Sequence, residues 1–285
     1  MAFTNEEVSN YYDQTAVHYR YFWKLEESMA LHYGIWRNGI KTLQESLIET
    51  NKELAQQANI QASDRVLDAG CGVGGSSIYL AKNIGCQAVG VTLSQQQADE
   101  AKANASRENV AHLVDFHQKD YTNTGFQANS FDVVWGIECH LTESTKETFV
   151  KEAQRVLKNG GRLIIGEYFK TSENLNEKQH KTLQKWLNYE AIADMVTLEK
   201  YKEWLEDNGF TNIRVTDVTK EITPSAKKIY QAALMGAIGT KAYNWFVKKA
   251  SYFSRVHYKG QIAQYQALKM KAWTYQIVYA EYQGK

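Results

Sequence analysis

The chain has 285 residues, of which 44% are hydrophobic and 23% charged, and its 33 basic and 32 acidic side chains leave a net charge of +1. A chain of this composition folds around a sizeable core, and its net charge gives no reason to expect a nucleic acid partner. The three cysteines lack CxxC spacing, so neither a disulfide framework nor a metal site is predicted. No apolar run approaches the ~20 residues of a membrane span, and the acidic start MAFTNEEVSN does not resemble an export signal. We expect a cytoplasmic protein.

The first part of the chain changes its periodicity near residue 62. Residues 5–60 are expected to be mostly helical, whereas short apolar runs then alternate with polar, helix-favouring segments. The expected strands cover residues 65–68, 87–92, 131–137 and 162–169, and the expected helices include 95–109 and 146–161. Alternating strands and helices predict βαβ units and a mostly parallel, doubly wound sheet of the α/β class.

The second part of the chain is expected to contain more helix. After Phe169 we expect a helical insert to about residue 192, followed by helix 197–208, strand 211–219, helices over 225–272 and a final strand over 273–282. Because a long insert precedes the final strand, we expect it to return antiparallel at the sheet edge. The predicted fold is therefore a Rossmann-like core with helical caps.

The segment VLDAGCGVGGSS, residues 66–77, is the strongest motif. A hydrophobic strand runs into Asp68, and four glycines follow before a helix-like stretch. Such glycines let the backbone turn tightly and approach a ligand at the carboxyl edge of the first strand. The spacing of Gly70, Gly72 and Gly75 also satisfies the dinucleotide fingerprint, so the glycines alone do not exclude NAD.

The sequence Asp-Ala-Gly-Cys-Gly resembles motif I of the class I methyltransferases that use S-adenosylmethionine (SAM) and release S-adenosylhomocysteine. The resemblance implies that this loop wraps the methionine part of SAM through Asp68, Gly70, Cys71 and Gly72. The next strand ends in GVTLSQQQ, residues 90–97, without the carboxylate that usually holds a ribose. This ending resembles the GxTLSxxQ variant of tocopherol methyltransferases, sterol methyltransferases and cyclopropane fatty acid synthases. It implies ribose contacts from Thr92, Leu93, Ser94 and Gln97.

Later segments resemble the same family and carry the likeness over residues 8 to 220. FHQKDYTNTGF, residues 116–126, resembles the segment in which an aspartate receives the adenine amino group, which implies Asp120 with Tyr121 beside it. FDVVWGIE, residues 131–138, resembles the fourth motif, whose strand ends at the methyl donor, and adds Trp135 to the expected cofactor site.

Glu138 and His140 are the candidate catalytic residues. In sterol, tocopherol and geranyl diphosphate methyltransferases, a glutamate at the position of Glu138 is implicated in acceptor binding or proton removal. Several relatives carry a histidine four residues later, where this chain has Thr142, and His140 is the only histidine nearby. An ion pair or helix cap is the alternative interpretation for Glu138, and an ordinary loop histidine is the alternative for His140.

Two aromatic segments, residues 11–23 and 31–36, resemble the lid that these families place over SAM and substrate. We expect the acceptor-binding site to be lined by aromatic and imidazole side chains, namely Tyr11, Tyr12, His32, Tyr33, Tyr168 and Trp245. The alternative is that these residues form an aromatic stripe in the core. Between Ile222 and Ala280 there are nine basic residues and no acidic one. The positive electrostatic field of such a segment attracts an anionic lipid, an anionic membrane surface or nucleic acid. The alternative is that these basic residues form an ordinary solvated helical face.

The sequence therefore predicts a SAM-dependent methyltransferase acting on a small, largely apolar acceptor such as an isoprenoid, sterol-like or prenyl-aromatic compound. The basic insert would suit an anionic or membrane-associated lipid acceptor, and hence a cytoplasmic or membrane-peripheral enzyme. The alternatives are an O- or N-methyltransferase of a polar natural product, a non-catalytic SAM-binding protein and an RNA methyltransferase. The expected parts are a helical lid (1–62), the SAM-binding core (63–170), a helical insert (171–196), a core continuation (197–222), a basic aromatic cap (223–272) and the final strand (273–285).

Overall fold

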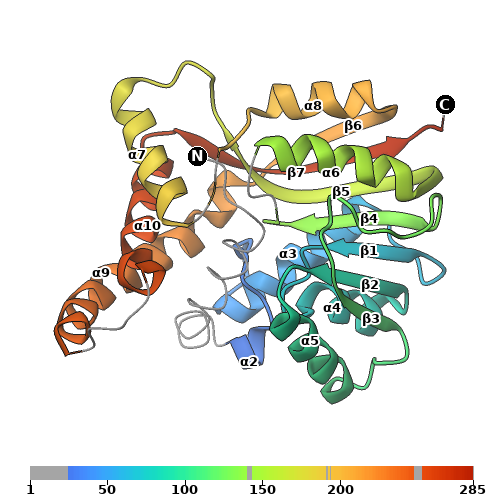
Figure 1. Ribbon diagram of the computed structural model, residues 1–285, viewed down its shortest axis with the longest axis horizontal. Coiled ribbons are helices and arrows are strands. Elements are labelled where there is room, and N and C mark those ends of the chain that lie inside the picture. The colour runs from blue at the N-terminus through green and yellow to red at the C-terminus, as the bar shows by residue number, and fades with distance from the viewer. Residues whose placement is uncertain (1–24, 140–142, 191, 193, 247–251, 285) are drawn as a thin grey trace.

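The computed structural model describes residues 25–139, 143–190, 192, 194–246 and 252–284. Its centre is a seven-stranded sheet in the order β3-β2-β1-β4-β5-β7-β6, with helices packed around it (Figure 1). The strands are β1 (Arg65–Ala69), β2 (Gln87–Thr92), β3 (Val114–Gln118), β4 (Phe131–Ile137), β5 (Leu157–Lys170), β6 (Phe210–Asp217) and β7 (Trp273–Tyr282). The first five strands in this order, from β3 to β5, pair in parallel with their neighbours. Strand β7 is antiparallel to both of its neighbours. The predicted α/β architecture with an antiparallel last strand is confirmed.

The position predicted for the last strand within the sheet was wrong. Strand β7 lies between β5 and β6 rather than at the edge, and it pairs with β5 from Arg162 opposite Glu281 to Lys170 opposite Trp273. Its residues are buried on both faces, whereas most residues of β6 are at least partly exposed. A strand that is apolar on both faces is stable only when neighbours and helices cover it, so β6 takes the edge.

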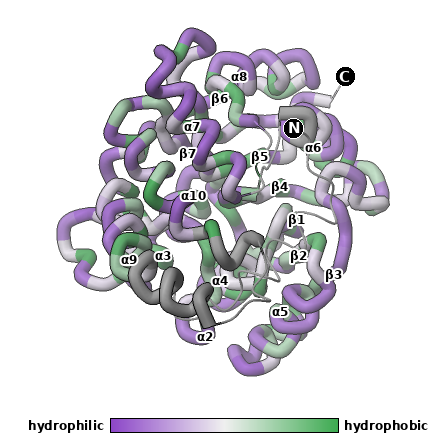
Figure 2. The backbone as a smooth tube through the Cα atoms, turned by 60° about the vertical axis from the view of Figure 1, so that its left-hand side comes forward, coloured by the Kyte–Doolittle hydropathy of each residue, from purple (hydrophilic) through white to green (hydrophobic). Residues whose placement is uncertain are grey.

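Four of the described helices begin at a side chain that accepts a hydrogen bond from one of their first N–H groups. They are α2 (Leu25–Ser28), α3 (Leu43–Gln57), α4 (Gly75–Ile84), α5 (Gln95–Arg107), α6 (Glu143–Val156), α7 (Glu177–Tyr189), α8 (Leu198–Asp207), α9 (Thr219–Phe246) and α10 (Tyr252–Lys269). Capping boxes at Thr42 and Asn176 start α3 and α7, and the hydroxyls of Ser94 and Thr197 cap α5 and α8. Hydrophilic positions predominate along outer helices such as α5 and α8 (Figure 2).

Three expected elements differ from the observed ones. The N-terminal helical region is interrupted, because residues 29–42 connect α2 to α3 without helix, and residues 1–24 lie outside the described part. The expected helix 146–161 ends at Val156, since Leu157 is fully buried opposite Phe131 and already belongs to β5. Strand β3 was not expected, because its sequence VDFHQ is largely polar and its position is an edge of the sheet.

The helical caps lie beyond the carboxyl end of β4. Figure 1 shows α7, α9 and α10 grouped on the left of the sheet, where the arrow of β4 ends. Helices α9 and α10 pack together through Tyr230 and Tyr265, whose ring centroids are 4.8 Å apart. Among the described helices, none is long and apolar enough to cross a membrane. The fold thus surrounds the strand ends, where doubly wound sheets bind ligands, with helical side chains.

Candidate active site

The glycine loop leaves its backbone bare on one side. Gly70 and Gly72 both have positive φ, at 78° and 53°, which glycine adopts without a steric penalty. A Cβ on Gly70 would lie 2.4 Å from Cβ of Cys139, whereas a Cβ on Gly72 would meet nothing within 4 Å. Gly70 therefore permits close packing against the chain after β4, and Gly72 borders open space.

Asp68 and Cys71 hold the loop from within the protein. Asp68 is buried and accepts a 2.7 Å hydrogen bond from the hydroxyl of Ser77, which joins the end of β1 to the first turn of α4. Burial raises the pKa of Asp68 to about 6, against the effect of the Ser77 hydrogen bonds. Cys71 is also buried, and its N–H donates to the carbonyl of Val91 over 2.9 Å. Both side chains shape the loop, and their contact with SAM remains a prediction.

The four residues expected beside the ribose form one turn between β2 and α5. The hydroxyl of Thr92 donates to Oε1 of Gln97 over 2.7 Å, and the hydroxyl of Ser94 accepts the Gln97 N–H over 3.2 Å. The carbonyl of Leu93 accepts from Nε2 of Gln118 in the neighbouring strand. The turn offers hydroxyl and amide groups and no carboxylate, as the sequence indicated.

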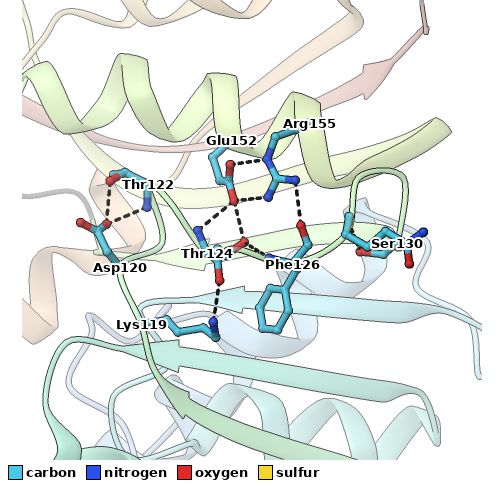
Figure 3. Close-up of polar contacts among 9 residues, drawn as sticks. Lys119, Asp120, Thr122, Thr124, Phe126, Ser130, Glu152 and Arg155 are labelled. Carbon is cyan, nitrogen blue, oxygen red and sulfur yellow. Dashed lines mark hydrogen bonds and ion pairs between the residues drawn. The ribbon is translucent and has the colours of Figure 1, made fainter.

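The loop after β3, which carries Asp120, is anchored to α6 (Figure 3). Oδ1 of Asp120 accepts from both the N–H and the hydroxyl of Thr122, at 2.8 and 2.7 Å. Oε1 of Glu152 accepts from the N–H and hydroxyl of Thr124, and Arg155 holds the same carboxylate through Nε and Nη2. The loop that would face the adenine is therefore anchored to α6 by the buried carboxylate of Glu152, which pairs with the partly exposed Arg155. Tyr121 is buried beside it, edge-on to Phe149.

Glu138 follows β4 in an unusual backbone conformation. Its φ is +49°, a left-handed value that costs a non-glycine residue roughly 1–3 kcal/mol, and such strain is concentrated at functional sites. Its N–H donates to the carbonyl of Gly166, which holds the turn against β5. Oε1 of its carboxyl accepts from the backbone N–H of Tyr33 at 2.6 Å and from the hydroxyl of Tyr275 at 2.9 Å. Elements from both ends of the chain thus converge on this carboxyl.

The carboxyl of Glu138 lies in an acidic environment. Burial raises its pKa to about 8, and the nearby carboxyls of Glu167 and Glu190 act in the same direction, whereas the hydrogen bonds from Tyr33 and Tyr275 oppose the shift. Glu190 has its own pKa raised by burial to about 8, although it accepts from the indole of Trp186 at 2.7 Å and from Gln261 at 2.6 Å. A carboxyl that titrates near neutral pH is suited to take up a proton.

Aromatic side chains form a wall beside Glu138. Tyr33 stacks on Trp273 with ring centroids 6.0 Å apart and meets Tyr275 edge-on at 5.9 Å. Trp273 also contacts the rings of Tyr168 and Trp186, at 6.2 and 5.1 Å. All five rings are buried, so the predicted residues Tyr33 and Tyr168 belong to one cluster with three residues that the sequence analysis did not single out. The alternation of aromatic residues in β7 was the available signal for Trp273 and Tyr275.

His32 is buried next to the residue that holds Glu138. Its Nδ1 lies 2.9 Å from the carbonyl of Tyr33, so Nδ1 carries the proton, and among the described residues Nε2 has no hydrogen-bond partner. Burial lowers the pKa of His32 to about 4, which keeps the imidazole neutral and Nε2 a hydrogen-bond acceptor.

Other predicted site residues have different positions. Trp135 is fully buried in the core, and its indole N–H has no hydrogen-bond partner in the described part of the chain. Tyr11, Tyr12 and His140 lie outside the described residues, and Trp245 belongs to α9 but its side chain is not described. The described residues also include no group of three or more His, Cys, Asp or Glu side chains that could hold a metal ion.

Comparison with known proteins finds a methyltransferase domain in the central part of the chain. Residues 66–161 match a family model described as a methyltransferase domain. The chain is 27% identical over 249 residues to the chloroplastic tocopherol O-methyltransferase of Arabidopsis thaliana, covering 80% of this chain and 69% of the relative. It is 28% identical over 238 residues to the norajmaline N-methyltransferase of Rauvolfia serpentina, covering 79% and 81%.

A solved structure shares the fold over nearly the full length. The geranyl diphosphate C-methyltransferase of Streptomyces coelicolor A3(2), in complex with S-adenosyl-L-homocysteine, matches with a TM-score of 0.73 and 17% identity over 97% of each chain. The bare backbone at Gly72, the polar turn at Thr92 to Gln97 and the anchored loop at Asp120 fit such a cofactor. The sheet order, the glycine loop and these relatives together identify the chain as a class I SAM-dependent methyltransferase.

Proposed function

We propose that this methyltransferase acts on a small, largely apolar acceptor of the isoprenoid, sterol-like or prenyl-aromatic class, and that Glu138 removes a proton from it. The observation that carries the proposal is the Glu138 carboxyl, held at the end of β4 beside five buried aromatic rings. The rings make the surroundings of Glu138 apolar, which favours an apolar acceptor, and aromatic π faces stabilise a developing cation. The tocopherol relative is consistent with such an acceptor.

SAM supplies an activated methyl group, so the protein has mainly to align donor and acceptor and to exclude water. In this proposal the loops at Gly72, Thr92 and Asp120 hold the cofactor, which directs its methyl group toward the end of β4. Oε1 of Glu138 accepts hydrogen bonds from the N–H of Tyr33 and the hydroxyl of Tyr275. Its Oε2 has no hydrogen-bond partner among the described residues. With a carbon acceptor, ionised Glu138 takes the proton that leaves after methylation. With an oxygen or nitrogen acceptor, it takes the proton during the transfer.

A second candidate is an O- or N-methyltransferase of a polar natural product. Its support is the neutral Nε2 of His32, because a buried acceptor atom suits a substrate that offers an O–H or N–H group. The norajmaline relative is consistent with this alternative. The same fold and the same proposed SAM site would serve both candidates, because the fold alone does not determine the acceptor.

A screen with isotopically labelled SAM separates the two candidates. Isoprenoids, sterols, prenylated quinols, phenols and alkaloid-like amines would be incubated with the full chain, and labelled products would be detected by mass spectrometry. The proposal expects label on an apolar prenyl or ring compound and loss of that label in Glu138→Gln. Transfer only to polar amines or alcohols supports the second candidate. Transfer to an apolar compound at the same rate in Glu138→Gln contradicts the role proposed for Glu138.

A further inference from the structure

We propose that Tyr275 is a positioning residue that sets both the direction and the proton affinity of the Glu138 carboxyl. The inference rests on the proposed function, because it concerns the same carboxyl, but it makes separate predictions. The hydroxyl of Tyr275 lies 2.9 Å from Oε1 of Glu138 although the two residues are 137 positions apart in the sequence.

Two donors on one oxygen fix the carboxyl. The Tyr33 N–H and the Tyr275 hydroxyl both donate to Oε1, so rotation of the carboxyl would break two hydrogen bonds. Oε2 is left with no partner in the described part of the chain. The arrangement therefore assigns one oxygen to the protein and presents the other to an acceptor, as a precisely aligned base requires.

Tyr275 is itself held firmly in place. Its N–H donates to the hydroxyl of Thr219, and its carbonyl accepts from the N–H of Val218, so both backbone groups are fixed by the start of α9. A Cβ on Gly166 of the neighbouring β5 would lie 3.2 Å from the Tyr275 hydroxyl, so the absence of a side chain at Gly166 leaves room for this hydroxyl. The ring is fully buried and meets Tyr33 edge-on.

The charges around Glu138 explain why a donor matters there. Glu167 from β5 and Glu190, the residue after α7, both disfavour a charge on Glu138. The thiol of Cys139 and the ammonium of Lys146 belong to the same electrostatic environment. The two hydrogen bonds to Oε1 favour the ionised carboxylate. Burial and the nearby Glu138 raise the pKa of Tyr275 well above its usual value, so this hydroxyl remains a donor at neutral pH. Removing the hydroxyl should raise the pKa of Glu138.

The test compares Tyr275→Phe with Tyr279→Phe. Tyr279 lies on the same strand and donates to Glu281 over 2.7 Å, so its variant controls for loss of a tyrosine hydroxyl from β7. Carbon-13 NMR of glutamate-labelled protein, with the Glu138 signal assigned by its absence in Glu138→Gln, would report the titration without any acceptor. We expect Tyr275→Phe to raise the pKa of Glu138 by about 1 unit, corresponding to a weak charge-assisted hydrogen bond. Tyr279→Phe should leave it unchanged.

Kinetics with the acceptor found in the labelling screen provide the second measurement. Tyr275→Phe should lower kcat about tenfold at pH 7 with little change in the SAM Kd, and activity should recover at higher pH as Glu138 ionises. In the Glu138→Gln background, Tyr275→Phe should have no further effect on kcat. An unchanged Glu138 titration and pH profile in Tyr275→Phe, in a protein with normal circular dichroism, would overturn this inference alone. Full activity of Glu138→Gln would instead contradict the proposed function.

Discussion

The backbone N–H of Tyr33 donates to Oε1 of Glu138 over 2.6 Å, which connects the segment before α3 to the end of β4 across 105 positions of sequence. The same segment also contacts the end of the glycine loop, because a Cβ on Gly75 would lie 2.1 Å from the carbonyl oxygen of Met29. Thr50 of α3 supports the segment by donating to the carbonyl of Tyr33. Residues 29–33 therefore contact both the glycine loop and the proposed base.

Glu138→Gln tests the proposed base directly. The amide has nearly the same size and its oxygen can still accept from Tyr33 and Tyr275, so SAM affinity should be retained. Turnover should fall by about 10² to 10⁴, the usual contribution of a positioned proton acceptor. In the parent, activity should rise with pH toward and above 8, because burial raises the pKa of Glu138 to about 8 and only the ionised form takes a proton.

Calorimetry for SAM and single-turnover rates across pH 6 to pH 9 would measure both effects. Bound SAM carries a positive sulfonium, which would move the rise to lower pH in the complex. Glu281→Gln is a suitable control, because Glu281 lies on β7 and pairs with Tyr279 away from this site. Equal turnover of Glu138→Gln and the parent, with chemistry rate-limiting, would assign Glu138 a structural role.

Gly72→Ala should separate ligand binding from folding. A Cβ there meets no protein atom within 4 Å, so it would enter the space expected for the methionine part of SAM and weaken binding by tenfold or more. Gly160→Ala is the matched control, because Gly160 has a similarly positive φ of 76° and equally open surroundings. Both variants should lose comparable stability from backbone strain, and only Gly72→Ala should lose SAM affinity.

Thermal shifts with SAM and NAD complete this comparison. A ligand at 100 times its Kd adds about 2.7 kcal/mol of stability, so SAM should raise the Tm of the parent and of Gly160→Ala. NAD should leave the Tm of all proteins unchanged. Gly70→Val is less informative, because its Cβ would collide with Cys139 and damage the fold whether or not SAM binds nearby. Undiminished SAM affinity in Gly72→Ala would remove this loop from the cofactor site.

Local sequence patterns correctly predicted the strands that consist of a clear apolar or aromatic run. The apolar runs at β2 and β4 and the aromatic run at β7 gave the observed bounds, because β-branched and aromatic residues favour extended, buried chain. The order of β7 within the sheet was not predictable in this way. Whether a strand lies at the edge depends on which partners it finds, and those partners are more than 100 residues away for Trp273 and Lys170.

The candidate site was predictable only in its local parts. Glu138 and the turn from Thr92 to Gln97 were identified because each belongs to a short contiguous segment that resembles a methyltransferase motif. The sequence did not identify Tyr275 and Trp273 as site residues, because the pairing of β7 with β5 brings them close to Glu138. Their aromatic character is equally typical of an ordinary buried strand, so composition alone does not distinguish a core residue from one that holds a carboxyl.

Glu152→Ala should loosen the loop that carries Asp120. The carboxylate of Glu152 is buried and accepts from Thr124 and Arg155, so its removal leaves several donors without a partner and should destabilise the protein by about 1–3 kcal/mol. SAM affinity should fall several-fold because the loop facing the adenine is less ordered. Glu147→Ala on the same helix removes only an exposed pair with Lys151 and should cost less than about 0.5 kcal/mol.

Urea unfolding and calorimetry on both variants would measure these effects. Loss of stability in Glu152→Ala with unchanged SAM affinity would show that the anchor stabilises the fold without ordering the cofactor loop. Equal stability and equal SAM affinity of the two variants would contradict the role proposed for the Glu152 carboxylate.

Glu190→Gln should reduce the dependence of stability on pH. Burial raises the pKa of Glu190 to about 8, well above the value of about 4.3 in an unfolded chain. Between these values the unfolded chain releases a proton that the folded protein retains. The stabilising contribution of Glu190 is therefore complete below pH 4 and is lost progressively as pH rises toward 8, at up to about 1.4 kcal/mol per pH unit.

The parent should consequently become less stable from pH 5.5 to pH 8, and Glu190→Gln should show a shallower decline over the same range. The slope is the informative quantity, because the amide also disturbs the hydrogen bonds from Trp186 and Gln261 and lowers stability at every pH. The control variant Glu177→Gln changes an exposed residue of α7 that pairs with Lys181, and it should keep the slope of the parent. Urea unfolding at intervals of half a pH unit would give the three slopes. Identical slopes for all three proteins would mean that Glu190 is ionised in the folded protein, and that its contacts with Trp186 and Gln261 compensate for the loss of water around its charge.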